Sequence, residues 1–306
     1  MFKASKPFLL LTFLCCAMAT VHAQHSFTLT NIPAMAKYQD SLIQIGERTA
    51  EALTNQERFA SNAQFIKTLV NALKTPSSFN HSFDSVKRIT VLKSPDKSFR
   101  IFSWHLPLDD GSYRYFGAIQ IATKDGKLKL HPLIDGTENL KDANAVTSNK
   151  NWYGAHYYEI IPVIVNGKSP YYALIGWKGN NNKTSKKLIE VLSFEKGEPV
   201  FGKAIFDQKQ DPGKNRIIFE YNKLNSMTLM MDKATNMIVF DHLAPFNQDM
   251  VGNYEFYASD LSFDAYRLSG GRLKLVENVE LKNAPNDLDE LYIDPKNKKI
   301  QPIKKL

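Results

Sequence analysis

The adjacent residues Asp241 and His242 form one motif that could carry out acid–base chemistry. A carboxylate beside an imidazole can orient the ring and share its proton, and Glu220 or Glu159 could complete the acid–base set of a hydrolase acting on glycans or peptides. Neighbouring residues of a β-strand point to opposite faces, so the two side chains can meet only where the strand ends, and Pro245 indicates a nearby end. The alternative, which we favour, is that Asp241 caps a turn and His242 is a half-buried structural residue.

A second candidate is a pair of segments rich in aromatic residues, 152–158 (WYGAHYY) and 171–177 (YYALIGW). Aromatic rings combine a large apolar area with polar edges, which suits a sugar ring or a peptide. On neighbouring strands these rings could form a binding surface, for which we predict the residues Trp152, Tyr153, His156, Tyr158, Tyr172, Trp177 and Asn180. The same rings could instead pack within the core, because aromatic pairs across strands are common.

The sequence shows no spacing that is typical of a metal or cofactor site, so we expect neither. The histidines considered as ligands are far apart, with no His-x-His or His-Glu-x-x-His motif: His105, His131, His156 and His242. A Gly-x-Ser-x-Gly motif and a glycine-rich phosphate loop are also absent. Both cysteines, Cys15 and Cys16, lie within the first 20 residues.

The overall composition is that of a globular protein with a modest positive charge. Hydrophobic residues make up 43% and charged residues 23% of 306 residues, which excludes a wholly disordered or collagen-like chain. There are 39 Lys and Arg residues against 31 Asp and Glu residues, for a formal charge of +8. This excess is spread along the chain, so it does not indicate binding to nucleic acid. The expected partner is an envelope, glycan or peptide ligand.

Residues 1–23 have the pattern of a secretory signal peptide. Lys3 and Lys6 precede an apolar stretch over 8–21, and Val21-His22-Ala23 supplies small residues at a cleavage site. We therefore expect an exported protein, periplasmic or extracellular after cleavage near Ala23, whose mature chain contains no cysteine. No later apolar stretch is long enough to predict a transmembrane segment in the mature chain.

Residues 24–84 are predicted to form a helical segment, with helices over 33–53 and 54–75. Apolar residues follow helical spacing at Met35, Tyr38, Leu42 and Ile45. Thr54 and Glu57 have the spacing of a capping box, which favours a helix start at this point. In the second helix the apolar face is expected to carry Phe59, Ala63, Ile66, Leu69, Val70 and Leu73. The two helices are expected to form a hairpin.

Residues 85–282 are predicted to form an antiparallel β domain, so the fold class is mainly β. The hydrophobic period changes to two from about Ile89, and about twelve strand-like segments are separated by turn signals such as Asp125-Gly126 and Asn166-Gly167. Such a β-meander could be propeller-like, because 99–104 can be aligned with 172–177 as a weak repeat, or it could form a sandwich or a partly closed barrel. Residues 283–306 are expected to form a basic tail.

Several stretches within this β domain also resemble a known group of sequences: 152–158, 172–180, 199–202 with 205–206, 216–221 and 238–245. Together they are similar to an uncharacterised family of exported proteins from Bacteroidetes-type bacteria, over residues 85–270. The resemblance implies a Gram-negative exported protein. It implies no activity and no catalytic residue. The expected function is therefore that of a non-catalytic binding or envelope-associated protein that uses the aromatic surface, and a secreted hydrolase is the alternative.

Overall fold

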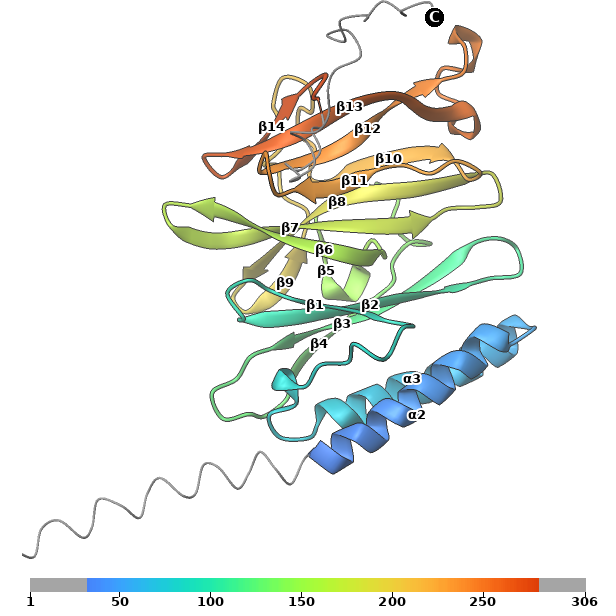
Figure 1. Cartoon of the computed structure of the whole chain (residues 1–306), viewed down its shortest axis with the longest axis vertical. Helices are drawn as coiled ribbons and strands as arrows, with labels where there is room; N and C mark the ends of the chain where they lie inside the picture. Colours follow the sequence, from blue (N-terminus) through green and yellow to red (C-terminus); the bar gives the residue numbers. More distant parts are fainter. Residues whose placement is uncertain (1–31, 281–306) are drawn as a thin grey trace, which may run out of the picture.

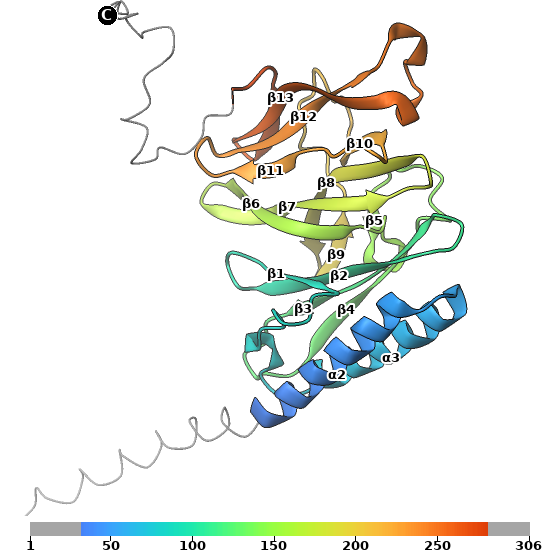
Figure 2. The same ribbon diagram turned by 45° about the vertical axis from the view of Figure 1, so that its right-hand side comes forward.

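The computed structural model describes residues 32–280, which form two helices followed by the strands β1 to β14. The predicted signal peptide (1–23) and the predicted basic tail (283–306) lie outside the described residues. The mainly β fold predicted from the sequence is confirmed. The helical hairpin lies along one side of a stack of three antiparallel sheets, as both views show (Figures 1 and 2).

The helical hairpin consists of α2 (Ile32–Glu51) and α3 (Asn55–Leu73). The capping box predicted at Thr54 is present: the Thr54 hydroxyl accepts from the backbone N–H of Glu57, and the Glu57 carboxylate accepts from that of Thr54. Within residues 32–280, neither helix is long and apolar enough to cross a membrane.

The buried face of α3 differs from the predicted one. Phe59, which was expected to be buried, is 39% exposed, whereas Asn62 and Phe65 are buried. The indole N–H of Trp104 donates to the Asn62 side chain over 2.8 Å, and this hydrogen bond allows a polar residue to occupy the buried face. The helix is therefore rotated relative to the purely apolar pattern.

Sheet 1 is a four-stranded meander whose strands follow one another in chain order: β1 (Thr90–Lys93), β2 (Phe99–Pro107), β3 (Tyr113–Ile121) and β4 (Lys129–Ile134). One of its faces packs on the helices, in a core that includes Leu42, Leu69, Phe102 and Trp104. Since neighbouring strand residues point to opposite faces, Phe99 and Ile101 are buried against sheet 2 instead.

Sheet 2 has the strand order β5-β9-β8-β7-β6, and β10 pairs with the first half of β8. Its strands are β5 (Thr147–Ser148), β6 (His156–Val165), β7 (Lys168–Gly179), β8 (Thr184–Glu195), β9 (Glu198–Phe201) and β10 (Ile217–Asn222). Sheet 3 is again a simple meander, made of β11 (Leu229–Asp232), β12 (Met237–Pro245), β13 (Tyr257–Ser269) and β14 (Arg272–Val276).

Two separate apolar cores hold the three sheets together. The core between sheets 1 and 2 contains Phe99, Ile101 and Leu188, and the core between sheets 2 and 3 contains Ile175 and Ile238. Face-to-face packing of this kind is common to β-sandwiches and to neighbouring blades of a propeller. None of the three sheets closes on itself within the described part of the chain.

Candidate functional site

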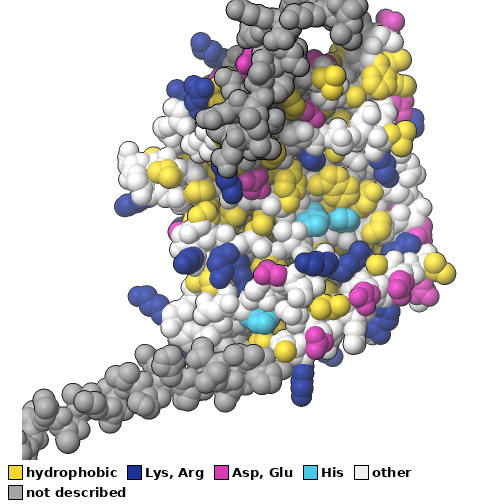
Figure 3. Space-filling model, in the orientation of Figure 1, with side chains coloured by type: hydrophobic (Ala, Val, Ile, Leu, Met, Phe, Trp, Pro, Cys, Tyr) yellow, Lys and Arg dark blue, Asp and Glu magenta, His cyan; other side chains and the backbone are white. Residues whose placement is uncertain are grey.

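Four half-buried rings meet where sheet 1 lies beside sheet 2: His105 from β2, Tyr113 from β3, His156 from β6 and Trp177 from β7. We call these four residues the ring cluster. The Trp177 ring centroid lies 4.8 Å from that of His105 and 5.1 Å from that of Tyr113, and the two imidazole centroids are 5.3 Å apart. On the face shown in Figure 3, histidine and hydrophobic side chains gather next to one another over the middle of the stack.

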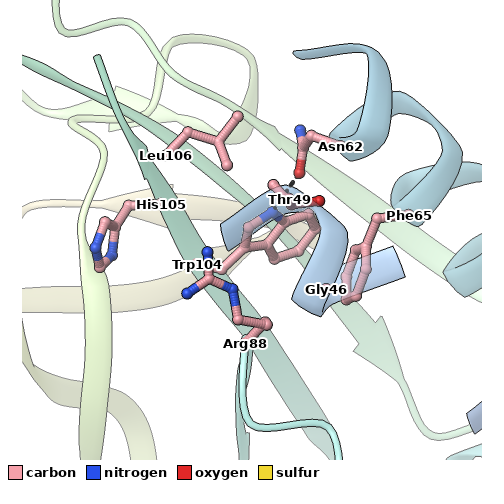
Figure 4. Close-up of a pocket in the computed structure, with 8 residues that line it drawn as sticks. All are labelled: Gly46, Thr49, Asn62, Phe65, Arg88, Trp104, His105 and Leu106. Atoms are coloured by element: carbon pink, nitrogen blue, oxygen red, sulfur yellow. Dashed lines mark hydrogen bonds between the residues drawn. The ribbon is translucent and has the colours of Figure 1, made fainter. Parts of the chain in front are cut away.

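The strand pairing of sheet 2 places part of this cluster in one row. Trp177 of β7 pairs with His156 of β6 on one side and with Lys187 of β8 on the other, and paired residues of a sheet share a face. From sheet 1, strand alternation directs Trp104 toward the helices and His105 to the other side, away from Asn62 and Phe65 (Figure 4). Strand pairing in sheet 2 and the alternation of side chains along β2 thus direct residues of both sheets toward the same place.

Close packing of Tyr113 depends on the absence of a side chain at position 179. A Cβ atom placed on Gly179 would lie 2.3 Å from the Tyr113 ring and 2.7 Å from the Trp177 ring. Real Cβ atoms do not approach other atoms so closely, so only glycine lets the Tyr113 ring lie against the end of β7. A glycine at position 179 is therefore needed for the observed positions of the Tyr113 and Trp177 rings.

The two imidazoles of the ring cluster are uncharged at neutral pH. Burial lowers the pKa of His105 to about 4, with His156 and Arg88 contributing by repulsion, and burial also lowers the pKa of His156. Their Nδ1 atoms are 3.2 Å apart, and His156 Nε2 contacts the Thr90 hydroxyl. Neutral imidazoles offer both a donor and an acceptor, so the cluster combines apolar ring faces with neutral hydrogen-bonding edges.

Tyr158 borders the ring cluster and is the most exposed aromatic residue of the predicted surface, at 37%. Its hydroxyl donates to the backbone oxygen of Leu229 over 2.8 Å, and burial of that hydroxyl raises its pKa. The Lys187 ammonium lies 5.5 Å from the centre of the ring, where burial lowers the pKa of the lysine. Tyr158 is thus fixed against sheet 3 while one part of its ring faces solvent.

A small pocket adjoins the ring cluster on the helix side. It is lined by Gly46, Arg88, Trp104 and His105, among others, and Figure 4 shows the Arg88 side chain lying alongside Trp104. Its volume is about 10 Å³, which is the size of a single water molecule. This pocket therefore cannot hold an organic ligand, and any ligand of the ring cluster must lie on its exposed side.

Three residues of the predicted binding surface lie in the core instead. Trp152 is 0%, Tyr153 5% and Tyr172 3% exposed, and all three pack between sheets 1 and 2. The Trp152 indole donates to the Tyr157 hydroxyl over 2.9 Å, so its polar atom is satisfied internally. The seven predicted residues therefore do not form one continuous surface. Of the rings among them, His156, Tyr158 and Trp177 reach solvent.

Asn180, also predicted to bind a ligand, holds the connection between β7 and β8. Its amide donates to Thr184 Oγ1 over 2.7 Å and to Glu220 Oε1 over 2.9 Å. Glu220 also forms an ion pair of 3.1 Å with Lys186. Both side chains thus have structural partners, and the Glu220 carboxylate is held within sheet 2.

The four candidate acid–base residues are not brought together. The Asp241 carboxylate accepts from the backbone N–H of Thr228, and Glu159 accepts from that of Met231 over 3.0 Å. No hydrogen bond or ion pair of residues 32–280 joins any two of Asp241, His242, Glu220 and Glu159. A bulge between positions 241 and 243 displaces His242 from the regular alternation of β12.

His242 has a different carboxylate partner from the predicted one. Its Nδ1 atom lies 2.8 Å from Asp264 Oδ2 on the neighbouring strand β13. This hydrogen bond is the main reason why the pKa of His242 is raised, and the His242 side chain is 49% exposed. Sequence reasoning missed Asp264, because only strand pairing brings positions 242 and 264 together.

Several buried charged residues were also missed by the sequence analysis, among them Arg216, Glu190 and Lys178. Arg216 and Glu190 form a fully buried ion pair with an N–O distance of 3.1 Å. The Lys178 ammonium donates to the backbone oxygens of Tyr153 and Gly154, and burial lowers the pKa of Lys178 to about 7. All three lie within or beside strands of apolar pattern, which gave no sign that their charges would be inside. Among the described residues, no group of three or more His, Cys, Asp or Glu could hold a metal ion.

A scan against protein-family models, a search of the curated proteins and a search of the solved structures each found no match to this chain. The resemblance to a family of exported bacterial proteins therefore stays a prediction from the sequence. We therefore infer the function from the sequence and the structure of this chain alone.

Proposed function

We propose that this chain is an exported, non-catalytic binding protein whose ring cluster, together with Tyr158, holds a glycan. The observation that supports the proposal best is the junction of two neutral imidazoles with the half-buried Trp177 and Tyr113 rings. A sugar ring has apolar C–H faces and a rim of hydroxyl groups. Aromatic faces stack against the C–H faces, and neutral donors and acceptors form hydrogen bonds with the hydroxyl groups.

The surroundings of the cluster are consistent with this ligand class. Two strands of sheet 2 and two strands of sheet 1 supply the rings, so the binding surface is built on rigid elements rather than on mobile loops. Export is supported by the sequence of residues 1–23, which lie outside the described residues. A periplasmic or extracellular location would expose the protein to envelope and environmental glycans.

The test is binding of the purified protein to an array of soluble oligosaccharides and polysaccharides, followed by calorimetric titration of each glycan that it retains. We expect Trp177→Ala to weaken binding by up to about tenfold, since stacking on an aromatic ring contributes about 0.5–1.5 kcal/mol. Phe246→Ala is the matched control, because Phe246 is also an exposed aromatic residue, at 61%, but lies in the connection between β12 and β13. Equal effects of the two substitutions, or no retained glycan, would contradict the proposal.

A hydrolase remains the second candidate, and the specific observation that favours it is the hydrogen bond between His242 and Asp264. A histidine with a raised pKa and an exposed ring could serve as a general acid. The test is release of reducing sugar or of amine from glycan and peptide substrates by the parent protein and by His242→Gln. Turnover that His242→Gln abolishes without a change in melting temperature would favour the enzyme over the binding protein.

A further inference from the structure

A pocket of about 320 Å³ lies at the end of sheet 1 opposite to the β2–β3 turn and the ring cluster. Its walls come from the segment after α3, from the β1–β2 turn and from the β3–β4 connection. The volume falls within the range of small-molecule sites, which begins at about 300 Å³. The pocket is therefore large enough for a compact organic ligand.

Positive charge dominates this pocket. Four of the residues that line it are lysines, Lys93, Lys97, Lys124 and Lys127, and we call the site the lysine pocket. Among residues 32–280, Lys127 alone of these four forms an ion pair, with Asp125 at 3.5 Å. Figure 3 shows several Lys and Arg side chains over the left-hand end of sheet 1.

A fifth cation, Arg100, lies buried next to the lysine pocket, and at 1% exposure it is closed off from water. Its guanidinium donates to Gln120 Oε1 over 2.9 Å, to the His81 backbone oxygen over 2.6 Å and to the Ser78 backbone oxygen over 2.8 Å. All of these acceptors are uncharged. Gln120 itself lines the pocket, so one side chain connects the buried cation to the pocket wall.

Two of these cations, Lys93 and Arg100, lie in surroundings that disfavour their charged form. Burial lowers the pKa of Arg100 to about 10, and burial with repulsion from Arg100 and Lys97 lowers that of Lys93. The carboxylates of the two turns beside the pocket, Asp96 and Asp125, neutralise only one of these cations. Asp96 accepts hydrogen bonds from Tyr172 and Ser98, and Asp125 forms an ion pair with Lys127, which leaves Lys93, Lys97, Lys124 and Arg100 without an ion-pair partner among residues 32–280. A buried or half-enclosed cation without a counter-ion is costly, and a bound anion would relieve that cost.

We propose that the lysine pocket binds a phosphate monoester carried by a molecule the size of a sugar phosphate. Lysine ammonium groups are compact point charges that surround a tetrahedral dianion well, whereas planar carboxylates favour the bidentate fork of an arginine. The Phe79 ring forms part of the wall, with the Lys93 ammonium 4.9 Å from its centre, and offers an apolar face to the organic part of the ligand. The site is separate from the ring cluster and stands whether or not that cluster binds a glycan.

The phosphate monoester can belong to a soluble sugar phosphate or to a lipid headgroup, and the test distinguishes the two. Calorimetric titration with glucose 6-phosphate, with glucose as the neutral comparison, measures the soluble source. Co-sedimentation with vesicles of phosphatidylcholine containing phosphatidic acid measures the lipid source. Vesicles with phosphatidylglycerol carry negative charge without a monoester, and they serve as the control for unspecific attraction.

The variants are Lys93→Gln/Lys124→Gln and the matched control Lys209→Gln/Lys233→Gln. All four lysines are exposed, so the two double variants lose the same charge and are expected to keep the parent melting temperature. We expect the pocket variant to weaken binding of the monoester by about tenfold or more, since it removes charge-assisted hydrogen bonds to the phosphate, and the control to leave it unchanged.

Binding of glucose 6-phosphate or of phosphatidic acid vesicles that the pocket variant alone weakens supports the proposal. Three results would overturn it. The first is no binding of either monoester at millimolar concentration in low salt. The second is an equal loss of binding in the two double variants. The third is equal binding of phosphatidylglycerol and phosphatidic acid vesicles by a protein that does not bind glucose 6-phosphate.

Discussion

Burial of His105 makes the stability of the fold depend on pH. Its pKa is about 4 in the folded protein, against 6.5 for an ordinary histidine. The unfolded chain therefore binds a proton first as the pH falls from 6.5, and the free energy of unfolding decreases until the pH reaches about 4. For His105 alone the loss amounts to up to about 3 kcal/mol.

Urea unfolding at neutral pH and near pH 4 checks this prediction. The variant His105→Gln is expected to lose less stability on acidification than the parent protein. His242→Gln is the control of opposite sign, because Asp264 raises the pKa of His242. The stabilisation by His242 is fully present below pH 6.5 and is lost as the pH rises through its raised pKa. Identical acid sensitivity in the parent protein and His105→Gln would show that this imidazole is not held neutral.

A second prediction at the residue scale concerns Gly179. In Gly179→Ala the new methyl group displaces the Tyr113 ring, because the Cβ position lies 2.3 Å from it. Ring tips can move, so we expect a change in melting temperature of no more than a few degrees, with glycan binding weakened by about tenfold. Calorimetry with the glycan retained by the parent protein measures the effect. Gly167→Ala is the comparison for a glycine with open space around it, although its positive φ of 73° adds backbone strain.

At the scale of secondary-structure elements, the sequence predicted most of the strands but not what lies between the sheets. Alternation from Phe99 onward identified β2, and the Asn166-Gly167 signal identified the turn between β6 and β7, because both depend on local chemistry. The two-residue strand β5 was missed, since it is too short to show a period. Which face of β6 and β7 is covered depends on a neighbouring sheet, and this is why Tyr172 was placed at the surface in error.

The ring cluster also shows that the sequence does not reveal which sheet lies opposite a strand. His156 and Trp177 were chosen correctly as half-exposed residues on paired strands, but their partners His105 and Tyr113 come from a different sheet. A period of two gives the direction of a side chain and says nothing about which sheet lies opposite. The bulge that separates His242 from Asp241 likewise leaves no trace in the residue types.

The buried ion pair between Arg216 and Glu190 gives a prediction at this scale. The Arg216 guanidinium also donates to the backbone oxygens of Ala143 and Ala145, so it ties the segment that precedes β5 to sheet 2. Arg216→Met leaves a buried carboxylate without a partner, and we expect a loss of about 3–5 kcal/mol in the free energy of unfolding. Arg216→Met/Glu190→Leu removes both charges and is expected to recover part of that loss. Chemical denaturation of the two variants tests this, and a larger loss in the double variant would contradict it.

For the whole molecule, the shared core predicts that helices and sheets unfold together. Phe65 of α3 packs on Trp104 of β2 with ring centroids 5.5 Å apart, so the hairpin is not an independent unit. Phe65→Ala should lower the free energy of unfolding by about 3–5 kcal/mol, with coincident denaturation curves from helical circular dichroism and tryptophan fluorescence. Separation of the two curves, with the helices melting first, would show that the hairpin is only loosely attached.

The stacked arrangement also explains how the molecule could carry two separate sites. Sheet 1 contributes its β2–β3 end to the ring cluster and its opposite end to the lysine pocket. Because both ends belong to one sheet that packs on the helices and on sheet 2, the two sites have fixed positions relative to each other.

The most direct test of the glycan proposal uses Trp177 as its own reporter. Of the three tryptophans, Trp104 and Trp152 are buried and only Trp177 is partly exposed. Acrylamide should therefore quench a fluorescence component that Trp177→Phe lacks, and a saturating amount of the retained glycan should protect that component. Bound glycan that leaves the quenching of Trp177 unchanged would place the binding site elsewhere and contradict the account.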